Sequence, residues 1–275
     1  MPRNPPPAPT DVLCETCGYT LNGLPPDAAC PECGEPVAAS TTRNPRRTPE
    51  FEIDGRGGSF RRTIVRVLLS PRAFFRTLDV RPANKRSRFV ANVSLGYAAL
   101  IAAKTALAHY GVIAAFGVTP DWLPHVALWV PMFYLLSAIV TFCTFEAVVR
   151  LAYWEGRMWG FRMSPSMTRR TMHYVAPHAM VAAMLPLLVP VTFLFLIASD
   201  RGRQAYAPYL THYLFVLSGA IIVSAIYLFR IFMKAMRGII RANPPGADPI
   251  SAARALPTPG EPIPPTGTPA APRAN

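Results

Sequence analysis

Four long apolar stretches, separated by short polar segments, dominate the hydropathy pattern of the chain. Each reaches the roughly 20 residues that an α-helix needs to cross a hydrocarbon core of about 30 Å at about 1.5 Å per residue. The pattern therefore predicts an all-α helical membrane bundle over residues 89–241. We expect four transmembrane helices, at about residues 92–116, 123–149, 174–198 and 210–232.

A shorter helical pattern precedes the bundle, over residues 60–80. Apolar side chains recur there at helical spacing, arginines cluster around the other side, and Pro71 interrupts the run. Such a basic amphipathic helix is typical of one that lies in the headgroup plane, with packing on the protein as the alternative. A second basic stripe extends the last span. We expect both stripes to anchor the protein to lipid headgroups, through Arg61, Arg62, Arg66, Arg230, Lys234, Arg237 and Arg241.

Three segments outside the bundle lack an apolar period. Residues 1–12 and 242–275 are rich in proline and too polar to bury a core that would offset the entropy of ordering, so we expect both to be disordered. Residues 39–59 are polar, basic and rich in proline and glycine, which is typical of a linker. This linker would separate the bundle from a small N-terminal domain at residues 13–38.

The distribution of charge agrees with a membrane location. The formal net charge is +13, yet 25 of the 28 lysines and arginines fall before the first apolar stretch, between the second and third, or from Arg230 near the end of the fourth onward. Cytoplasmic segments of membrane proteins carry such an excess. The first residues also lack the apolar core of a signal peptide. We therefore expect a multi-pass protein of the cell (inner) membrane, with both termini in the cytoplasm and no need for nucleic acid as a partner.

Two Cys-x-x-Cys pairs stand in the N-terminal domain, within CETCGYTLNGLPPDAACPECG at residues 14–34. Each pair forms a tight turn whose two sulfurs point the same way, so four thiolates can converge on one tetrahedral ion. The glycine after each second cysteine permits a positive φ and lets backbone amides turn toward the sulfurs. The spacing predicts one structural zinc ion bound by Cys14, Cys17, Cys30 and Cys33.

The same four cysteines leave two alternatives open. One is a pair of disulfides, which a reducing cytoplasm disfavours. The segment resembles zinc ribbons, and its knuckles are also similar to those of rubredoxin, a resemblance that implies iron and electron transfer; the longer insert that builds the rubredoxin core is absent here. With all four positions filled by protein, a zinc ion has no open site for water, so its role would be structural and not hydrolytic.

Two ionisable residues, Lys104 and Glu146, fall within the first and second predicted spans. Burying a charge in the bilayer is costly, so both side chains should face protein or water. A structural ion pair between them is the favoured interpretation, although Glu146 is expected nearer the cytoplasmic boundary than Lys104. The alternative is a polar cavity or ion path.

Two further motifs flank the start of the bundle. LLSPRAFFRTL at residues 68–78 precedes the first span, and MTRRTMHYVAPHAMVAAMLPLL at residues 167–188 enters the third. In these motifs the chain resembles the Yip family of multi-pass membrane proteins, from residue 60 to about 235. That family commonly has five spans, so the resemblance implies four or five here. Its eukaryotic members are associated with vesicle traffic and small GTPases, but only the architecture is carried over to this chain.

The sequence contains no Walker A, Rossmann, G-x-S-x-G or H-E-x-x-H pattern, so we expect no enzyme. Our leading hypothesis is a membrane protein whose cytoplasmic zinc ribbon docks a protein partner or organises membrane lipid. The alternative is a transporter or channel that uses Lys104 and Glu146. A ribbon that binds nucleic acid at the membrane is the weakest interpretation, because residues 14–34 contain no lysine or arginine.

Overall fold

The chain divides into two compact units, each described by itself. Unit 1 comprises Met1–Pro6 and Pro45–Ala242 and contains the long helices, while unit 2 comprises Pro7–Asn44 and Asn243–Asn275 and contains the paired cysteines. Unit 2 therefore joins two segments that lie far apart in the sequence. The computed structural model describes residues 11–42, 46–115, 126–158, 164–198, 202, 204–205, 207–243 and 247–254.

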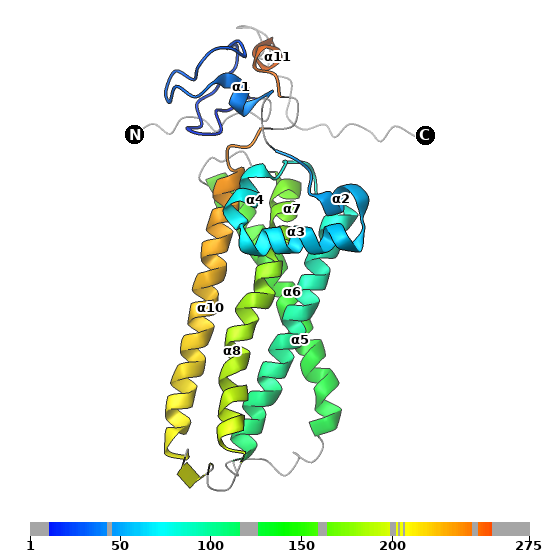
Figure 1. Cartoon of the computed structure of the whole chain (residues 1–275), viewed down its shortest axis with the longest axis vertical. Helices are drawn as coiled ribbons and strands as arrows, with labels where there is room; N and C mark the ends of the chain where they lie inside the picture. The colour runs from blue at the N-terminus through cyan, green and yellow to red at the C-terminus, as the bar shows by residue number, and fades with distance from the viewer. Residues whose placement is uncertain are drawn as a thin grey trace. The chain divides into compact units, whose positions relative to one another are not determined.

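Four long helices form unit 1, and they confirm both the all-α class and the predicted number of spans within the described residues. Each is long and apolar enough to cross a membrane. The described residues contain no β-strand, only isolated bridges. Figure 1 shows the four helices running alongside one another. They are α5 (Lys85–Ala115), α6 (Val126–Met158), α8 (Pro177–Leu196) and α10 (Leu210–Ile239), the last preceded by the 3-10 turn η2 (Ala207–Tyr209).

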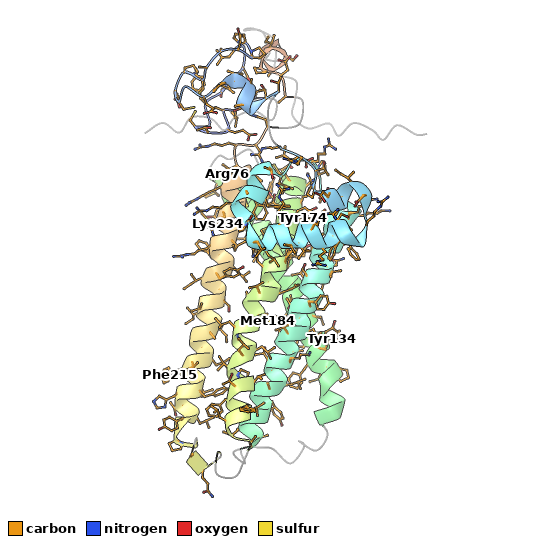
Figure 2. The ribbon with its side chains drawn as sticks, viewed as in Figure 1. Arg76, Tyr134, Tyr174, Met184, Phe215 and Lys234 are labelled. Atoms are coloured by element: carbon orange, nitrogen blue, oxygen red, sulfur yellow. The ribbon has the colours of Figure 1, made fainter. Side chains whose placement is uncertain are left out.

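Helices α5 and α8 form the centre of the bundle and pack on each other. Helix α8 also packs against α10, while α6 packs mainly on α5. Large apolar side chains elsewhere on these helices remain exposed, such as Leu135 on α6 at 60% and Phe215 on α10, labelled in Figure 2, at 73%. Exposed apolar surface on this scale is unfavourable in water and is what helices need against hydrocarbon. The exposed side chains therefore support a membrane protein independently of the length of the helices.

The third predicted span, residues 174–198, is divided in the structure. Helix α7 (Pro165–Val175) ends just before Ala176, and α8 begins at Pro177. Proline has no amide hydrogen to donate and its ring clashes with the preceding turn, so it suits the first position of a helix and not an interior one. The structure thus corrects the start of this span by three residues and makes α7 a separate element.

Three short helices occupy the segments that the sequence analysis assigned to a linker and to one amphipathic helix. They are α2 (Glu50–Asp54), α3 (Gly57–Leu69) and α4 (Pro71–Thr77). The linker prediction is corrected because α2 is a folded part of unit 1 with Phe51 in the main apolar core. Ser70 separates α3 from α4, and Pro71 starts the second helix. Figure 1 shows α3 lying across the long helices of unit 1.

The apolar face of α3 packs on the protein. This agrees with the alternative interpretation of residues 60–80 and not with insertion of that face among lipid headgroups. Val67 is fully buried in the core, and Phe60 and Ile64 pack against the same cluster. Only Val65 and Leu69 among its large apolar side chains are exposed, at 44% and 79%. Protein contacts therefore fix the position of α3, and a narrow apolar strip remains to face its surroundings.

A buried guanidinium joins these short helices to the bundle. Arg170 on α7 donates from Nε and Nη2 to the carboxylate of Glu52 at 3.0 and 2.9 Å. Its Nη1 donates to the carboxylate of Asp79, and to the Asp79 backbone carbonyl at 2.8 Å. Burial would lower the pKa of Arg170, but the two carboxylates raise it above its usual value. All three side chains are 1–3% exposed, so this ion pair is screened little by water.

Neutral donors complete the network around the two carboxylates. The hydroxyl of Tyr174 donates to Glu52 at 2.5 Å, and the amide of Asn84 donates to the same carboxylate at 2.7 Å. Burial and the Glu52 charge raise the pKa of Tyr174, which keeps its donor proton in place. The hydroxyl of Thr48 donates to Asp79 at 2.7 Å. The segment predicted as a linker thus contributes one of the most deeply buried charges in the described part of unit 1.

Replacing Arg170 tests whether this network holds unit 1 together. Arg170→Met leaves the buried Glu52 carboxylate without a cation and leaves Asp79 with only the exposed Arg81, 3.3 Å away, so we expect the free energy of unfolding to fall by about 3–5 kcal/mol. Chemical unfolding of the purified protein in detergent micelles measures the loss. The matched control is Arg62→Ala, which removes an ion pair with Glu50 whose side chains are 67% and 58% exposed and should cost about 0–1 kcal/mol. Equal losses in the two variants would contradict the network.

A second titratable group on α7 is buried without its charge. His173 is 4% exposed, and its Nδ1 lies 3.1 Å from the hydroxyl of Ser87. Burial, helped by the charges of Arg88, Arg169 and Arg170, lowers the pKa of His173 to about 4. The ordinary value near 6.5 applies in the unfolded chain, which therefore binds more protons between pH 4 and 6.5. Stability must fall as the pH is lowered through that window.

We expect His173 to account for a loss of about 3 kcal/mol as the pH falls from 6.5 to 4. His173→Gln keeps a hydrogen-bonding side chain but does not titrate, so this variant should lack that part of the pH dependence. The free energy of unfolding of both proteins is measured at each pH. Subtracting one curve from the other removes the contribution of the carboxylates, which the two proteins share. Parallel stability curves would show that the imidazole is not buried in its neutral form.

Candidate metal centre

The two cysteine knuckles of unit 2 repeat the same backbone pattern with an offset of sixteen residues, from Cys14 to Cys30. In each, the amide of the first cysteine donates to a carbonyl five residues later, at 2.8 Å. The amide of the following glycine donates back to the carbonyl of that first cysteine, at 2.8 or 2.9 Å. Gly18 and Gly34 have φ of 90° and 74°, which confirms the left-handed conformation predicted for them.

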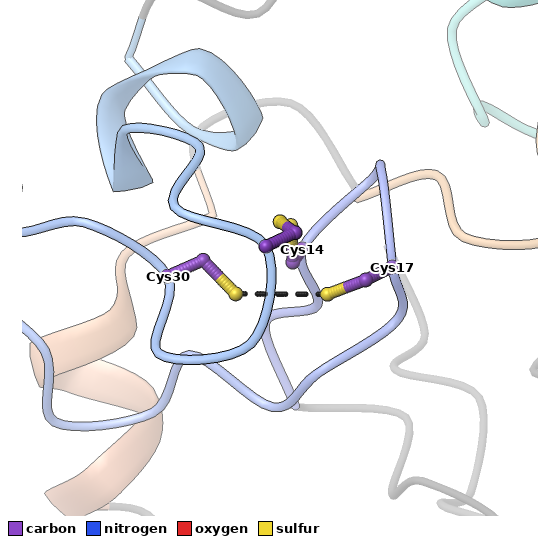
Figure 3. A group of neighbouring side chains, drawn as sticks. Cys14, Cys17 and Cys30 are labelled. Carbon is purple, nitrogen blue, oxygen red and sulfur yellow. Dashed lines mark hydrogen bonds between the residues drawn. The ribbon is translucent and has the colours of Figure 1, made fainter.

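The knuckles bring four sulfurs together. The Sγ atoms of Cys14, Cys17, Cys30 and Cys33 all lie within 4.8 Å of one another. Cys14 and Cys33 are 3.5 Å apart, and Cys17 and Cys30 are 3.6 Å apart (Figure 3). A tetrahedral zinc ion with bonds of about 2.3 Å holds its sulfurs roughly 3.8 Å apart. The geometry is therefore compatible with one zinc ion and far too open for disulfides, whose bond is about 2.05 Å.

The four thiols are electrostatically unequal. Burial would raise the pKa of Cys14, but hydrogen bonds from the backbone amides of Cys17 and Thr16 bring it down to about 7. Burial and the neighbouring thiols raise the pKa of Cys17 to about 12. Four adjacent thiolates repel one another, and a divalent cation removes that penalty. The cluster fits a tetrahedral metal with sulfur ligands, and the filled coordination shell would leave no position for a substrate.

A small apolar core supports the knuckles from behind. Leu21, which lies between the two cysteine pairs in the sequence, is fully buried, and Leu24 packs against the same cluster. Val12 and Val37 flank the knuckles and are also buried, so unit 2 begins earlier than predicted and Val12 does not belong to a disordered tail. The predictions for residues 1–10 lie outside the described residues.

The segment after the last long helix completes unit 2. The amide of the buried Asn243 donates to the carbonyls of Leu13 and Ser40 at 2.6 and 2.9 Å, and its Oδ1 accepts from the Leu13 amide at 2.9 Å. One side chain thereby satisfies three backbone groups beside the first knuckle. Because these groups lie in the interior, their loss would leave polar atoms without partners.

Helix α11 (Pro249–Arg254) adds a second contact from the same segment. Its residue Ala252 lies in the apolar core with the cysteines, and the carbonyl of Pro249 accepts from the amide of Gly23 at 2.8 Å. The prediction of a disordered tail over 242–275 is corrected for this part, because apolar burial and backbone pairing offset its ordering entropy. The remainder, from residue 255 onward, lies outside the described residues.

The structure does not pair Lys104 with Glu146. Glu146 lies 3.2 Å from Arg169 of α7, and Lys104 is exposed on α5 with no ion pair to the described residues. Glu146 and Asn92 line one hollow, and Lys104 follows Asn92 by twelve residues, or about 18 Å along a helix. The pairing prediction is corrected because this axial separation exceeds the reach of the side chains.

The predicted headgroup anchors gather at one end of unit 1. Figure 2 shows the predicted anchor Lys234 of α10 at the end that also carries Tyr174 and Arg76, an arginine of α4 that was not among the predicted anchors. Lys234 is half-buried, and the others are exposed, with Arg62 also paired to Glu50. The exposed anchors are Arg61, Arg62, Arg66, Arg230, Arg237 and Arg241.

Comparisons of the chain with models of protein families, with curated proteins and with solved structures find no match. The class of protein is therefore defined by its own features, namely a helical membrane bundle and a zinc-ribbon-like motif of four cysteines. The resemblance to the Yip family stays a prediction from two sequence motifs. The described residues contain four candidate spans, where that family commonly has five.

The sequence analysis missed Asn243 and the buried pair of Arg170 and Glu52. A start and stop signal for α2 is visible in retrospect, because Pro49 precedes it and Gly55, with φ of 69°, ends it. An acidic residue inside such a short helix is a candidate for pairing with a distant arginine. Asn243 gives no comparable local signal, since its partners lie more than 200 residues away.

Asn243→Ala tests the contribution of the late segment to the metal centre. The variant leaves three backbone groups beside the first knuckle unsatisfied, so we expect unit 2 to lose about 1–3 kcal/mol and to release zinc faster to a chelator. A colorimetric chelator assay on the purified protein measures the rate. The control is Ser251→Ala, which removes an exposed hydrogen bond from Ser251 of α11 to Asp248. This variant should retain zinc like the parent. Identical release from both variants would contradict a structural role for Asn243.

Proposed function

We propose that the chain is a non-enzymatic, multi-pass membrane protein whose zinc-bound unit 2 docks a protein partner. The observation that supports this most directly is the convergence of four cysteine sulfurs within 4.8 Å in a compact unit of its own. Four protein ligands stabilise a fold but activate no water. Zinc then serves to hold a rigid surface, which suits recognition better than catalysis.

The chemistry of unit 2 favours a basic partner. Residues 14–42 contain no lysine or arginine, while Asp27, Glu32 and Glu35 are exposed. Four thiolates around a divalent zinc ion add further net negative charge. Complementary charge speeds association and selects the partner. We therefore propose a basic peptide segment or protein face as the docking partner and regard nucleic acid, which is itself anionic, as excluded from this surface.

The sidedness of the protein belongs to the same proposal. The excess of lysines and arginines before the first span and after the fourth supports cytoplasmic termini in the cell (inner) membrane. A reducing cytoplasm would also keep the four cysteines available for zinc. Exposed arginines of α3 and α10 then lie where anionic headgroups occur. Cleavage of a tag at either terminus by a protease confined to the outside of intact cells would overturn this orientation.

Docking is tested by photo-crosslinking from unit 2 in intact membranes. A crosslinking amino acid at position 19, where Tyr19 is 38% exposed, should capture a discrete partner from the parent protein. Cys17→Ser with Cys30→Ser should remove zinc and abolish capture. Glu32→Gln with Glu35→Gln should keep zinc and reduce capture about tenfold, because the attraction to a basic surface is weakened.

Cys143→Ser is the matched control, because Cys143 is an exposed thiol on α6 outside the metal cluster. This variant should retain both zinc and capture. If the double cysteine variant loses its zinc and still captures the same partner, the zinc-bound unit is not the docking surface. If the glutamine variant captures as well as the parent, the partner is not recognised by charge.

A transporter is the second candidate, and one cavity favours it. A half-open cavity of about 660 Å³ lies among α5, α6, α7, α8 and α10, lined largely by apolar side chains such as Ala98, Val140 and Leu228. Neither Lys104 nor Glu146 lines it, and an ion path needs polar groups along its length. The cavity therefore suits an apolar solute more than an ion. Ion flux into proteoliposomes that disappears in Lys104→Met or Glu146→Gln would favour the channel over docking.

A further inference from the structure

A second hollow of unit 1, distinct from the apolar cavity, is lined by charged side chains. It has a volume of about 240 Å³ and lies among α5, α6 and α7. Two arginines, one carboxylate, one amide and one imidazole face it, from Arg88, Asn92, Glu146, Arg169 and His173. The sequence analysis assigns no role to four of these five residues.

The guanidinium groups of the hollow are incompletely satisfied. Arg169 donates from Nη2 to Glu146 at 3.2 Å, but its Nε is buried and has no hydrogen-bond partner. A buried donor without a partner is costly and marks a place for a missing acceptor. Arg88 is exposed, and its side chain makes no ion pair or hydrogen bond with the described residues. The Arg88 guanidinium is therefore available to bind an anion, and Arg169 keeps one unused donor at Nε beside its ion pair with Glu146.

The balance of charge specifies a singly charged anion. Two guanidinium groups and one carboxylate give the hollow a net charge of about +1, with His173 buried in its neutral form. One negative charge brings the site to neutrality, whereas a metal cation would meet two arginines. Planar guanidinium groups also match the oxygens of a phosphate better than an ammonium group does.

The position of the hollow selects the source of that anion. Arg88 and Asn92 lie in the first turns of α5, and Arg169 lies on α7, ahead of the candidate span Pro177–Leu196. The hollow is thus at the margin of the apolar segments, where lipid headgroups occur. From Glu146 an exposed apolar row follows along α6 at helical spacing, formed by Phe142, Ile139 and Leu135. Acyl chains attached to a bound phosphate would lie against this row.

We propose that this hollow binds the phosphodiester of an anionic glycerophospholipid, with Arg88, Arg169 and Asn92 as the donors to the phosphate oxygens. Glu146 holds Arg169 in place and limits the affinity by repelling the phosphate. The site is independent of the zinc-bound unit and of its partner. Through α7 it adjoins the buried Arg170 network, so the lipid would be bound by the helix that organises the short helices of unit 1.

The experiment measures lipid retention by native mass spectrometry of the full-length protein. The probe is phosphatidylglycerol, titrated into detergent micelles, and phosphatidylcholine with the same acyl chains is the reference. We expect saturable retention of one phosphatidylglycerol, weakened about tenfold or more in Arg88→Gln and in Arg169→Gln, because each loses a charge-assisted hydrogen bond. The Arg88 side chain has no ion-pair partner in the described residues, so its variant should keep the melting temperature of the parent.

Two further variants separate recognition from folding. Arg150→Gln removes an exposed arginine one turn along α6 outside the hollow and should leave retention unchanged. Glu146→Gln removes the charge that repels the phosphate, so this variant should bind phosphatidylglycerol more tightly than the parent. If Glu146 had only a structural role, the substitution would not increase the affinity. Retention that is equal in Arg88→Gln and the parent, or equal for the two lipids, would overturn the proposal. Inorganic phosphate that displaces the lipid at equal concentration would assign the site to a soluble anion instead.

Discussion

The ion pair of Arg170 with Glu52 and Asp79 is the constraint on which the arrangement of unit 1 depends. A charge in a nearly dry interior must be compensated where it stands, and here both carboxylates meet the same guanidinium. Glu52 belongs to α2, Asp79 follows α4, and Arg170 belongs to α7. Satisfying one side chain therefore fixes three segments against the ends of the long helices.

This network gives unit 1 a specificity that apolar packing alone does not provide. Leucine, valine and alanine side chains on long helices tolerate small rotations and shifts in register. A bidentate guanidinium with hydrogen bonds from Tyr174 and Asn84 to its partner carboxylate tolerates few of them. The lipid-facing helices can thus remain chemically simple while their positions are set at one end by polar contacts.

The sequence predicts the elements that follow from local pattern and misses those that depend on distant partners. The four spans and the convergence of Cys14, Cys17, Cys30 and Cys33 follow from length and spacing, and both are confirmed. The start of the third span is predicted three residues too early, since Pro177 starts a new helix instead of continuing the old one. Glu52 was placed in a linker because its partner, Arg170, is 118 residues away.

The sequence also fails to predict the partners of charged residues in the spans. The sequence analysis pairs Lys104 with Glu146 because each is the charge that the first or second predicted span contains, but helix pitch places them at different depths. Glu146 instead meets Arg169, a residue of a separate short helix that the hydropathy pattern does not distinguish from its neighbours. A sequence reveals which charges need a partner, while the partner is chosen by how the helices are staggered.

The discontinuity of unit 2 has a consequence for the biogenesis of the protein. Asn243 and α11 complete a fold whose first knuckle emerges from the ribosome about 230 residues earlier. At translation rates of about 5–20 residues per second, the cysteines wait for more than ten seconds before their closing segment exists. During that delay the knuckles lack the hydrogen bonds of Asn243 and the apolar contact of Ala252. A fully assembled metal centre therefore reports that synthesis has passed the last long helix.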